Sequence, residues 1–126
     1  MIYVCQIIFL LAILVIPQKI YADSPIFVDS PEDAFALSEH TKIDVLLIFT
    51  AKWCGACQTL KTDLVNNTSM IEDKIVCYVD YDKRPDMVKE YSVRIIPDSF
   101  IYSKMKEIKR KTGYTSKKEY EKWILE

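Results

Sequence analysis

The chain has 126 residues, of which 50% are hydrophobic and 28% are charged, and its 17 Lys and Arg against 18 Asp and Glu give a formal net charge of -1. This mixture is typical of one globular domain and argues against a disordered chain or a basic nucleic-acid binder. Only two glycines are present, whereas phosphate-binding loops need several within one turn, so nucleotide chemistry is not expected.

The first 22 residues predict a targeting segment. Residues 1–16 are almost entirely apolar, Pro17 interrupts the run, and the chain turns polar after Ala22. The run is shorter than the roughly 20 residues of a membrane-spanning helix, and a small residue near its end suits cleavage. We expect a signal peptide over 1–22 and an exported domain over 23–126, either periplasmic or secreted. An uncleaved signal anchor, which would tether the domain to the membrane, is the alternative.

The domain begins with a strand and a helix. Residues 26–28 are a short apolar run, and Ser30 then predicts a helix start. Pro31 suits the first helical position, and Asp33 completes a capping box with the serine. Residues 45–49 are apolar throughout and rich in β-branched side chains, which is typical of a central strand buried on both faces. Such a strand needs helices on both sides of its sheet.

Helices and strands continue to alternate after this strand. Cys57, Leu60 and Leu64 recur at helical spacing and predict a helix that ends near Asn66. The pattern then predicts a strand at 75–79, a helix at 85–91, a strand at 99–102, a polar edge strand at 106–111 and a helix that begins at Ser116. The alternation predicts one α/β domain.

Two cysteines lie at the junction between the central strand and the helix after it. Cys54 and Cys57 enclose too short a loop to be an effective structural staple. Near a helix start, the unpaired N–H groups and the dipole favour a thiolate. We therefore predict Cys54 as the exposed nucleophile and Cys57 as the shielded, resolving cysteine. Gly55 and Ala56 are small enough for another protein's backbone to approach, and Trp53 can cover the rim.

Around this pair the sequence resembles the thioredoxin family. Residues 46–57 are similar to the family's central strand and active-site turn, and 79–82 to its next strand. Residues 91–97 are similar to the end of its short helix and the loop that ends in a cis-proline, and 112–114 to the bend before its last helix. The resemblance spans 26–126. It implies a thioredoxin-like fold, with a mixed sheet of four or five strands flanked by helices, and dithiol-disulfide oxidoreductase activity.

The resemblance also implies a substrate site. Pro97 would be cis and face the sulfur of Cys54, and Ile96 would offer its backbone to an extended substrate strand. The partners would be client proteins with thiols or disulfides and a redox partner such as a membrane thiol reductase. We expect no cofactor beyond the cysteine pair itself, no bound metal and no nucleic acid, and we expect a monomer.

Three positions depart from the family's pattern. Ile48 stands where the family commonly has a buried Asp that helps to deprotonate the second cysteine, and Tyr78 stands where a Lys often pairs with that Asp. Without them, Cys57 must lose its proton to water or to another group. Asp98 stands where the family often has Thr, and its charge is expected to raise the pKa of Cys54 unless solvent screens it.

The cysteines also have structural interpretations. A zinc site needs four ligands, but there is no second pair and the single histidine, His40, lies on another predicted helix. Cys77 lies in a predicted interior strand, where a thiol usually acts as a small hydrophobic side chain. We therefore favour redox chemistry for the pair and a buried, inert role for Cys77.

The leading hypothesis is an exported thiol-disulfide oxidoreductase. No histidine lies between Cys54 and Cys57, and this favours a reductant over a strong oxidant. One alternative is an oxidase or isomerase of secreted proteins. Another is a thioredoxin-fold binding or chaperone module without redox turnover, which the residues at 48 and 78 favour.

Overall fold

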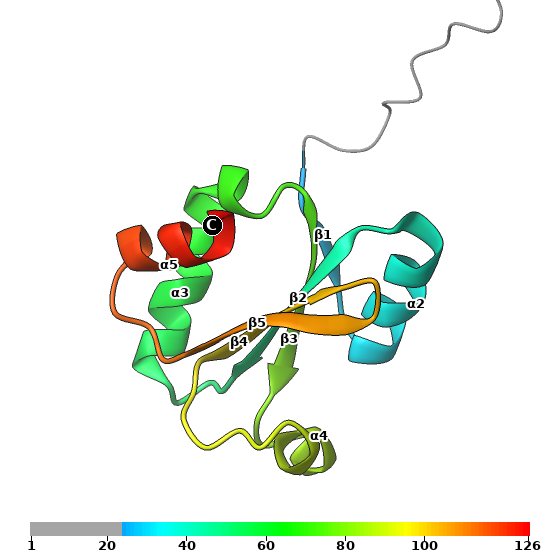
Figure 1. Ribbon diagram of the computed structural model, residues 1–126. Helices are drawn as coiled ribbons and strands as arrows, with labels where there is room; N and C mark the ends of the chain where they lie inside the picture. Colours follow the sequence, from blue (N-terminus) through cyan, green and yellow to red (C-terminus); the bar gives the residue numbers. More distant parts are fainter. Residues whose placement is uncertain (1–23) are drawn as a thin grey trace, which may run out of the picture.

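Five strands form one mixed sheet in the order β1-β3-β2-β4-β5 (Figure 1). The computed structural model describes residues 24–126, and the predicted signal peptide lies outside this range. The strands are β1 (Ile26–Val28), β2 (Asp44–Thr50), β3 (Lys74–Asp80), β4 (Asp98–Ser103) and β5 (Lys106–Thr112). β2 runs parallel to β3 and antiparallel to β4. The prediction of a central strand near 45–49 and an edge strand near 106–111 is confirmed.

Two of the helices, α2 and α5, begin where the sequence predicts caps. The helices are α2 (Pro31–Thr41), α3 (Gly55–Asn66), α4 (Pro85–Glu90) and α5 (Lys117–Leu125), with a short 3-10 helix, η1 (Thr68–Met70). The Ser30 hydroxyl accepts a hydrogen bond from the backbone N–H of Asp33, and the Ser116 hydroxyl accepts one from the N–H of Glu119. These bonds satisfy N–H groups that the first turn of a helix leaves free. Only η1 was not predicted.

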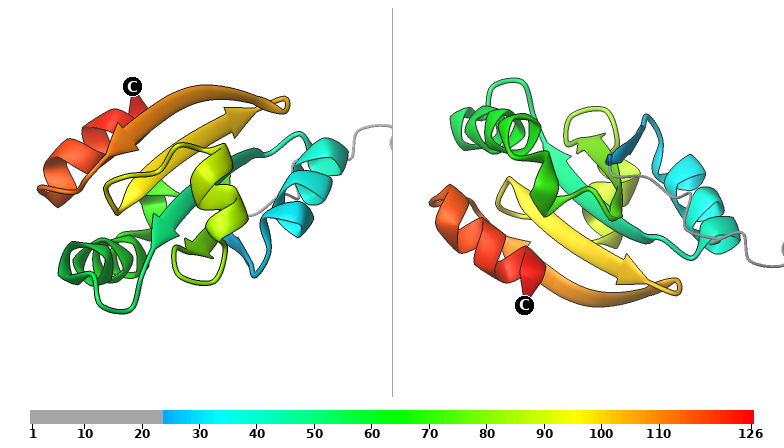
Figure 2. Two further views of the ribbon diagram at one scale, coloured as in Figure 1. Left: turned by 90° about the horizontal axis from the view of Figure 1, so that it is seen from below. Right: turned by 90° about the horizontal axis from the view of Figure 1, so that it is seen from above.

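The helices cover both faces of the sheet, α2 and α4 on one face and α3 and α5 on the other (Figure 2). Alternate residues of β2 point to the two layers. Leu47 and Phe49 pack in the α2 and α4 layer, and Leu46 and Ile48 pack in the α3 and α5 layer. All four side chains are fully buried, each worth about 2 kcal/mol of hydrophobic stabilisation. This two-sided burial explains the unbroken apolar run.

The carboxyl end of β2 positions the cysteine pair. After Thr50 the chain makes a short turn, and α3 begins at Gly55. The Ala51 carbonyl holds this turn, because it accepts hydrogen bonds from the Cys54 N–H at 3.2 Å and from the Gln58 side chain at 3.1 Å. The strand therefore delivers the first cysteine directly to the start of a helix. Within residues 24–126, no helix is long and apolar enough to cross a membrane.

Candidate active site

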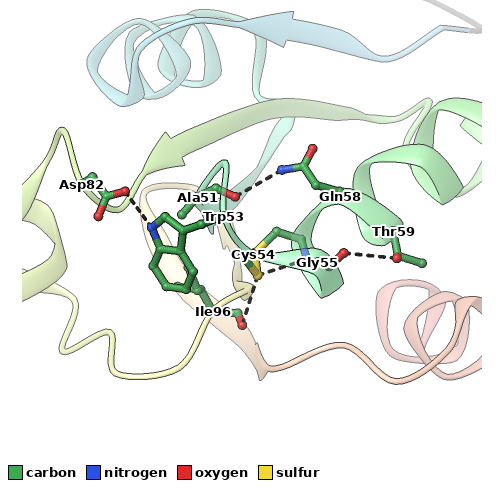
Figure 3. Close-up of a disulfide and its surroundings, with 9 residues drawn as sticks. Ala51, Trp53, Cys54, Gly55, Gln58, Thr59, Asp82 and Ile96 are labelled. Carbon is green, nitrogen blue, oxygen red and sulfur yellow. Dashed lines mark hydrogen bonds between the residues drawn. A yellow bond between two sulfur atoms is a disulfide. The ribbon is translucent and has the colours of Figure 1, made fainter.

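Cys54 and Cys57 form a disulfide at the N-terminus of α3, with their Cα atoms 5.2 Å apart (Figure 3). Cys54 is the N-cap residue, in an extended conformation, one position before the first helical turn that we predicted for it. Its Sγ accepts a hydrogen bond from the backbone N–H of Cys57 at 3.2 Å. A donor aimed at this sulfur, at the positive end of the helix, stabilises the thiolate that forms on reduction.

The two sulfurs differ in exposure in the predicted order. Cys54 keeps 7% of its surface exposed and Cys57 keeps none. Cys54 is nevertheless more covered than expected, because its Sγ lies 3.7 Å from the carbonyl oxygen of Ile96. This remaining exposure makes Cys54 the accessible member of the pair.

The loop before β4 closes one side of the site. The peptide bond between Ile96 and Pro97 is cis, as expected, and Pro97 is buried. Ile95, the residue before them, exposes 60% of its surface. The structure thus brings the Ile96 backbone against Cys54 and leaves an apolar side chain beside it. The substrate-binding roles of Ile96 and Pro97 stay predictions.

The rim of the site also carries an exposed tryptophan. Trp53 exposes 67% of its surface, and its indole Nε1 donates a hydrogen bond to Asp82 Oδ2 at 2.8 Å (Figure 3). Its ring meets Tyr81 edge to face, with 6.4 Å between the ring centroids. Sequence reasoning missed Asp82 as a partner of Trp53. Its place directly after the strand next to β2 was the available signal, because neighbouring parallel strands end at the same edge of a sheet.

The two residues between the cysteines are open to a partner. Gly55 and Ala56 are exposed, and a Cβ atom added to Gly55 would meet nothing within 4 Å. The predicted approach of another backbone is therefore sterically free here, although the structure contains no partner chain.

Ile48 and Tyr78, the positions that depart from the family's Asp and Lys, are direct partners across β2 and β3. Ile48 is fully buried. The Tyr78 hydroxyl is the one buried side-chain N or O atom of residues 24–126 that lacks a hydrogen-bond partner, and burial raises the pKa of Tyr78 to about 12. The Lys61 ammonium lies 4.8 Å from the centre of its ring. A phenol that stays protonated at neutral pH does not replace the missing carboxylate as a base.

Asp98 is buried and has partners that the sequence analysis did not identify. Its carboxylate is fully buried and accepts hydrogen bonds from Arg110 Nη2 at 2.6 Å, Arg110 Nε at 3.2 Å and Thr112 Oγ1 at 3.1 Å. The charge that was expected to act on Cys54, unless solvent screened it, is instead paired with Arg110. Sequence reasoning missed Arg110. The β4–β5 hairpin register, which pairs Asp98 with Thr112, was the signal that could have found it.

Cys77 lies outside the site. It is fully buried in β3 and is a free thiol, and burial raises its pKa to about 12. These features agree with the buried, inert position expected for it. In the described part of the chain, no group of three or more His, Cys, Asp or Glu side chains is placed to hold a metal ion.

Comparisons with known proteins agree with this geometry. The thioredoxin family model matches residues 30–126. A thioredoxin of Chlamydia trachomatis is 33% identical over 73 residues, which cover 58% of this chain and 72% of the relative. A thioredoxin of Rickettsia typhi is 30% identical over 86 residues, which cover 68% and 82%. The crystal structure of a thioredoxin from Nicotiana alata has a TM-score of 0.67 at 26% identity and covers 81% of this chain and 90% of that one. The chain therefore belongs to the thioredoxin family, and it is a protein-disulfide oxidoreductase that works by thiol-disulfide exchange through Cys54 and Cys57.

Proposed function

We propose that the protein is an exported reductant that donates electrons to disulfides of client proteins outside the cytoplasm and is itself reduced by a membrane thiol reductase. The direction of electron flow is inferred from the dipeptide between the cysteines. Gly55 and Ala56 place no imidazole beside the sulfurs, and such a group is one way to stabilise a thiolate so strongly that the reduced form dominates. The apolar segment at 1–16 supports export.

The exchange proceeds in two steps. The Cys54 thiolate attacks a client disulfide, so that a bond forms between Cys54 and one client sulfur while the client's S–S bond breaks and its second sulfur leaves as a thiolate that takes up a proton. The Cys57 thiolate then attacks Cys54, which forms the Cys54–Cys57 disulfide and releases the first client sulfur. Two electrons pass to the client, and the Cys57 N–H, 3.2 Å from the Cys54 sulfur, stabilises charge on that sulfur.

Client docking is proposed along the loop before β4. An extended client segment would pair with the backbone at Ile96 beside Pro97, and the exposed Ile95 would contact its side chains. Trp53 would cover the rim, and the open surface at Gly55 and Ala56 would admit the client backbone.

The reduction potential of the pair tests the direction. The purified protein would be equilibrated with glutathione or with a thioredoxin standard, and its free thiols would then be trapped and counted. A value of about -270 to -230 mV is expected for a donor of electrons. A value near about -120 mV would instead make the protein an oxidant of newly exported thiols and overturn the proposed direction.

Export needs its own test. The full chain would be expressed in a bacterium, and the N-terminus of the product in the periplasmic fraction would be sequenced. A start at Asp23 is the expected result. Retention of the full-length chain in the membrane would favour the signal anchor, and retention in the cytoplasm would contradict export.

One observation favours a second function, a binding or chaperone module without redox turnover. The side chains at 48 and 78 give Cys57 no carboxylate or free base. A Cys54→Ala variant separates the two functions. Loss of client-directed activity indicates chemistry at Cys54, whereas full activity without this sulfur would show that binding alone suffices.

A further inference from the structure

The first residue of β4 carries a buried charge next to the cis-proline. Asp98 follows Pro97 directly and has no exposed surface. An ionised carboxylate is costly to bury unless a partner compensates its charge and fills its hydrogen-bonding positions. Arg110 and Thr112 of β5 supply three such bonds. Side chains of β5 therefore hold the Asp98 carboxylate inside the β4–β5 hairpin, and its position depends on Arg110.

The Arg110 guanidinium also holds a second point of the chain. Its Nη2 donates to the backbone carbonyl of Ser92 at 3.2 Å, while its carbon lies 4.7 Å from the centre of the Phe100 ring. The ring face favours the cation and fixes its plane. Ser92 itself, two positions after the end of α4, has a φ of 52°, in the left-handed region. One side chain thus contacts both the end of the α4 turn and the start of β4.

These two anchor points enclose the loop that meets the active-site sulfur. Residues 93–97 lie between Ser92 and Asp98, and they include Ile96, whose carbonyl oxygen is 3.7 Å from Cys54 Sγ. The Pro97 carbonyl gives a third anchor, because it accepts a hydrogen bond from the Gly113 N–H at 2.7 Å. Strand β5 and the residue after it therefore set the position of the backbone that faces Cys54.

We propose that Arg110 and Asp98 are positioning residues that clamp both ends of the 93–97 loop and so determine how tightly a protein disulfide docks opposite Cys54. A small disulfide needs only the sulfur, whereas a protein substrate also needs the loop backbone in place. The inference rests on thiol-disulfide exchange at Cys54 and not on the direction of electron flow. A measured oxidising potential would overturn the proposed reductant role and leave the clamp as it stands.

The test compares two substrates in three variants, Arg110→Met, Asp98→Asn and the double variant Asp98→Ser with Arg110→Met. Dithiothreitol serves as the reductant, insulin as the protein disulfide and hydroxyethyl disulfide as the small, neutral one. The clamp predicts that KM for insulin rises roughly tenfold, because small displacements of a positioning group cost about one to two orders of magnitude. The second-order rate constant with hydroxyethyl disulfide should stay within about twofold of the wild-type value.

The double variant separates positioning from stability. Arg110→Met leaves a buried carboxylate unpaired and destabilises the fold, whereas the double variant removes both charges and should unfold near the wild-type urea concentration. The clamp predicts that its KM for insulin nevertheless stays raised. If KM for insulin returned to the wild-type value together with stability, Asp98 and Arg110 would act only on folding. If the rates with both substrates fell equally, the pair would act on the reactivity of the Cys54 sulfur. Either result overturns the proposal.

Lys109→Met is the matched control. Lys109 is the neighbour of Arg110 on β5, and its ammonium donates to the Trp123 carbonyl of α5 at 2.9 Å, away from the loop. This variant also loses one cationic side chain and its hydrogen bond, but KM for insulin should not change. A rise equal to that of Arg110→Met would show that lost positive charge alone weakens insulin binding, which would contradict the clamp.

Discussion

Two regions of the same sheet hold cysteines in opposite chemical environments. At the end of β2, Cys54 lies at a helix start, where the Cys57 N–H points at its sulfur and some surface stays open. In the interior of β3, Cys77 has no exposed surface, and burial raises its pKa to about 12. Cys54 follows the end of β2 by four residues, Cys77 lies within β3, and Leu47 of β2 pairs directly with Cys77. The difference teaches that the position of a thiol along a strand, at its end or in its middle, decides between a nucleophile and a packing group.

The largest expected effect comes from removing the resolving cysteine. Cys57→Ala should abolish multiple turnover, because Cys54 can still attack a client disulfide but nothing displaces the client from it. Mixed disulfides should accumulate and appear as higher bands on a non-reducing gel that vanish with dithiothreitol. Cys54→Ala, as the control, should form none. Adducts in that control would mean that Cys57 attacks by itself and that the two sulfurs are less different than their exposure indicates.

Alkylation of Cys77 tests the other half of the comparison. A pKa raised from its ordinary value to about 12 lowers the thiolate fraction near pH 8 by about a thousandfold, and burial blocks access as well. Iodoacetamide should therefore label the reduced native protein at Cys54 and leave Cys77 unlabelled, as peptide mass spectrometry would show. Urea-unfolded protein is the control and should be labelled at Cys54, Cys57 and Cys77. Equal native labelling would remove the distinction between the two regions.

The same raised pKa has a consequence for stability. The unfolded chain ionises Cys77 at a lower pH than the folded chain does, so the folded state binds the proton more tightly. The stability that this provides is fully present at neutral pH and is lost as pH rises toward about 12. Urea unfolding at increasing alkaline pH should show a loss that is smaller in Cys77→Ala. An equal loss in both proteins would show that other groups account for the alkaline instability.

A smaller effect on stability is expected when the hydroxyl groups of two tyrosines in the α3 and α5 layer are removed. Tyr120 donates a hydrogen bond to Ser99 Oγ at 2.8 Å, whereas the Tyr78 hydroxyl has no partner. Tyr120→Phe should cost about 1 to 2 kcal/mol, because it leaves a buried serine oxygen unpaired. Tyr78→Phe should be neutral or stabilise by up to about 1 kcal/mol. Urea denaturation measures both, and a clear loss in Tyr78→Phe would reveal a partner for its hydroxyl.

The smallest effect is expected at the rim of the site. Trp53→Phe keeps an aromatic ring but removes the hydrogen bond to Asp82, and Asp82→Asn weakens the same bond from the other side. Both groups are exposed, so we expect KM for insulin to change by only about twofold in each variant. The double variant should be no worse than either single one. Additive effects would show that Trp53 and Asp82 act independently.

Much of the fold was predictable because local signals agreed with one another. Ser30 and Ser116 predicted helix starts, and the apolar run of β2 predicted a strand buried on both faces. The 3-10 helix η1 was missed, because its three residues carry neither a periodic pattern nor a side-chain cap. Boundaries of the strands shifted by about one residue where backbone pairing extended past the apolar side chains.

The site was predictable in its cysteines but not in its supporting contacts. Cys54 and Cys57 are three positions apart in the sequence, so the geometry of a helix start alone relates them. Arg110 reaches Asp98 only across a hairpin, and Asp82 reaches Trp53 only because β2 and β3 are neighbours. Such contacts depend on strand pairing, which a single sequence does not specify. The partners of Asp98 were missed for this reason, and its effect on the pKa of Cys54 stays a prediction.

The lysine-rich edge of the sheet affects how the molecule meets copies of itself. An outer strand presents unpaired backbone groups that can recruit another strand. Here β5 carries Lys106 and Lys111, and Lys104 lies in the turn before it. Two copies that approached edge to edge would bring these ammonium groups together, and like charges would separate them. The proposed pairing of client strands at Ile96 would therefore not be accompanied by pairing between copies through β5.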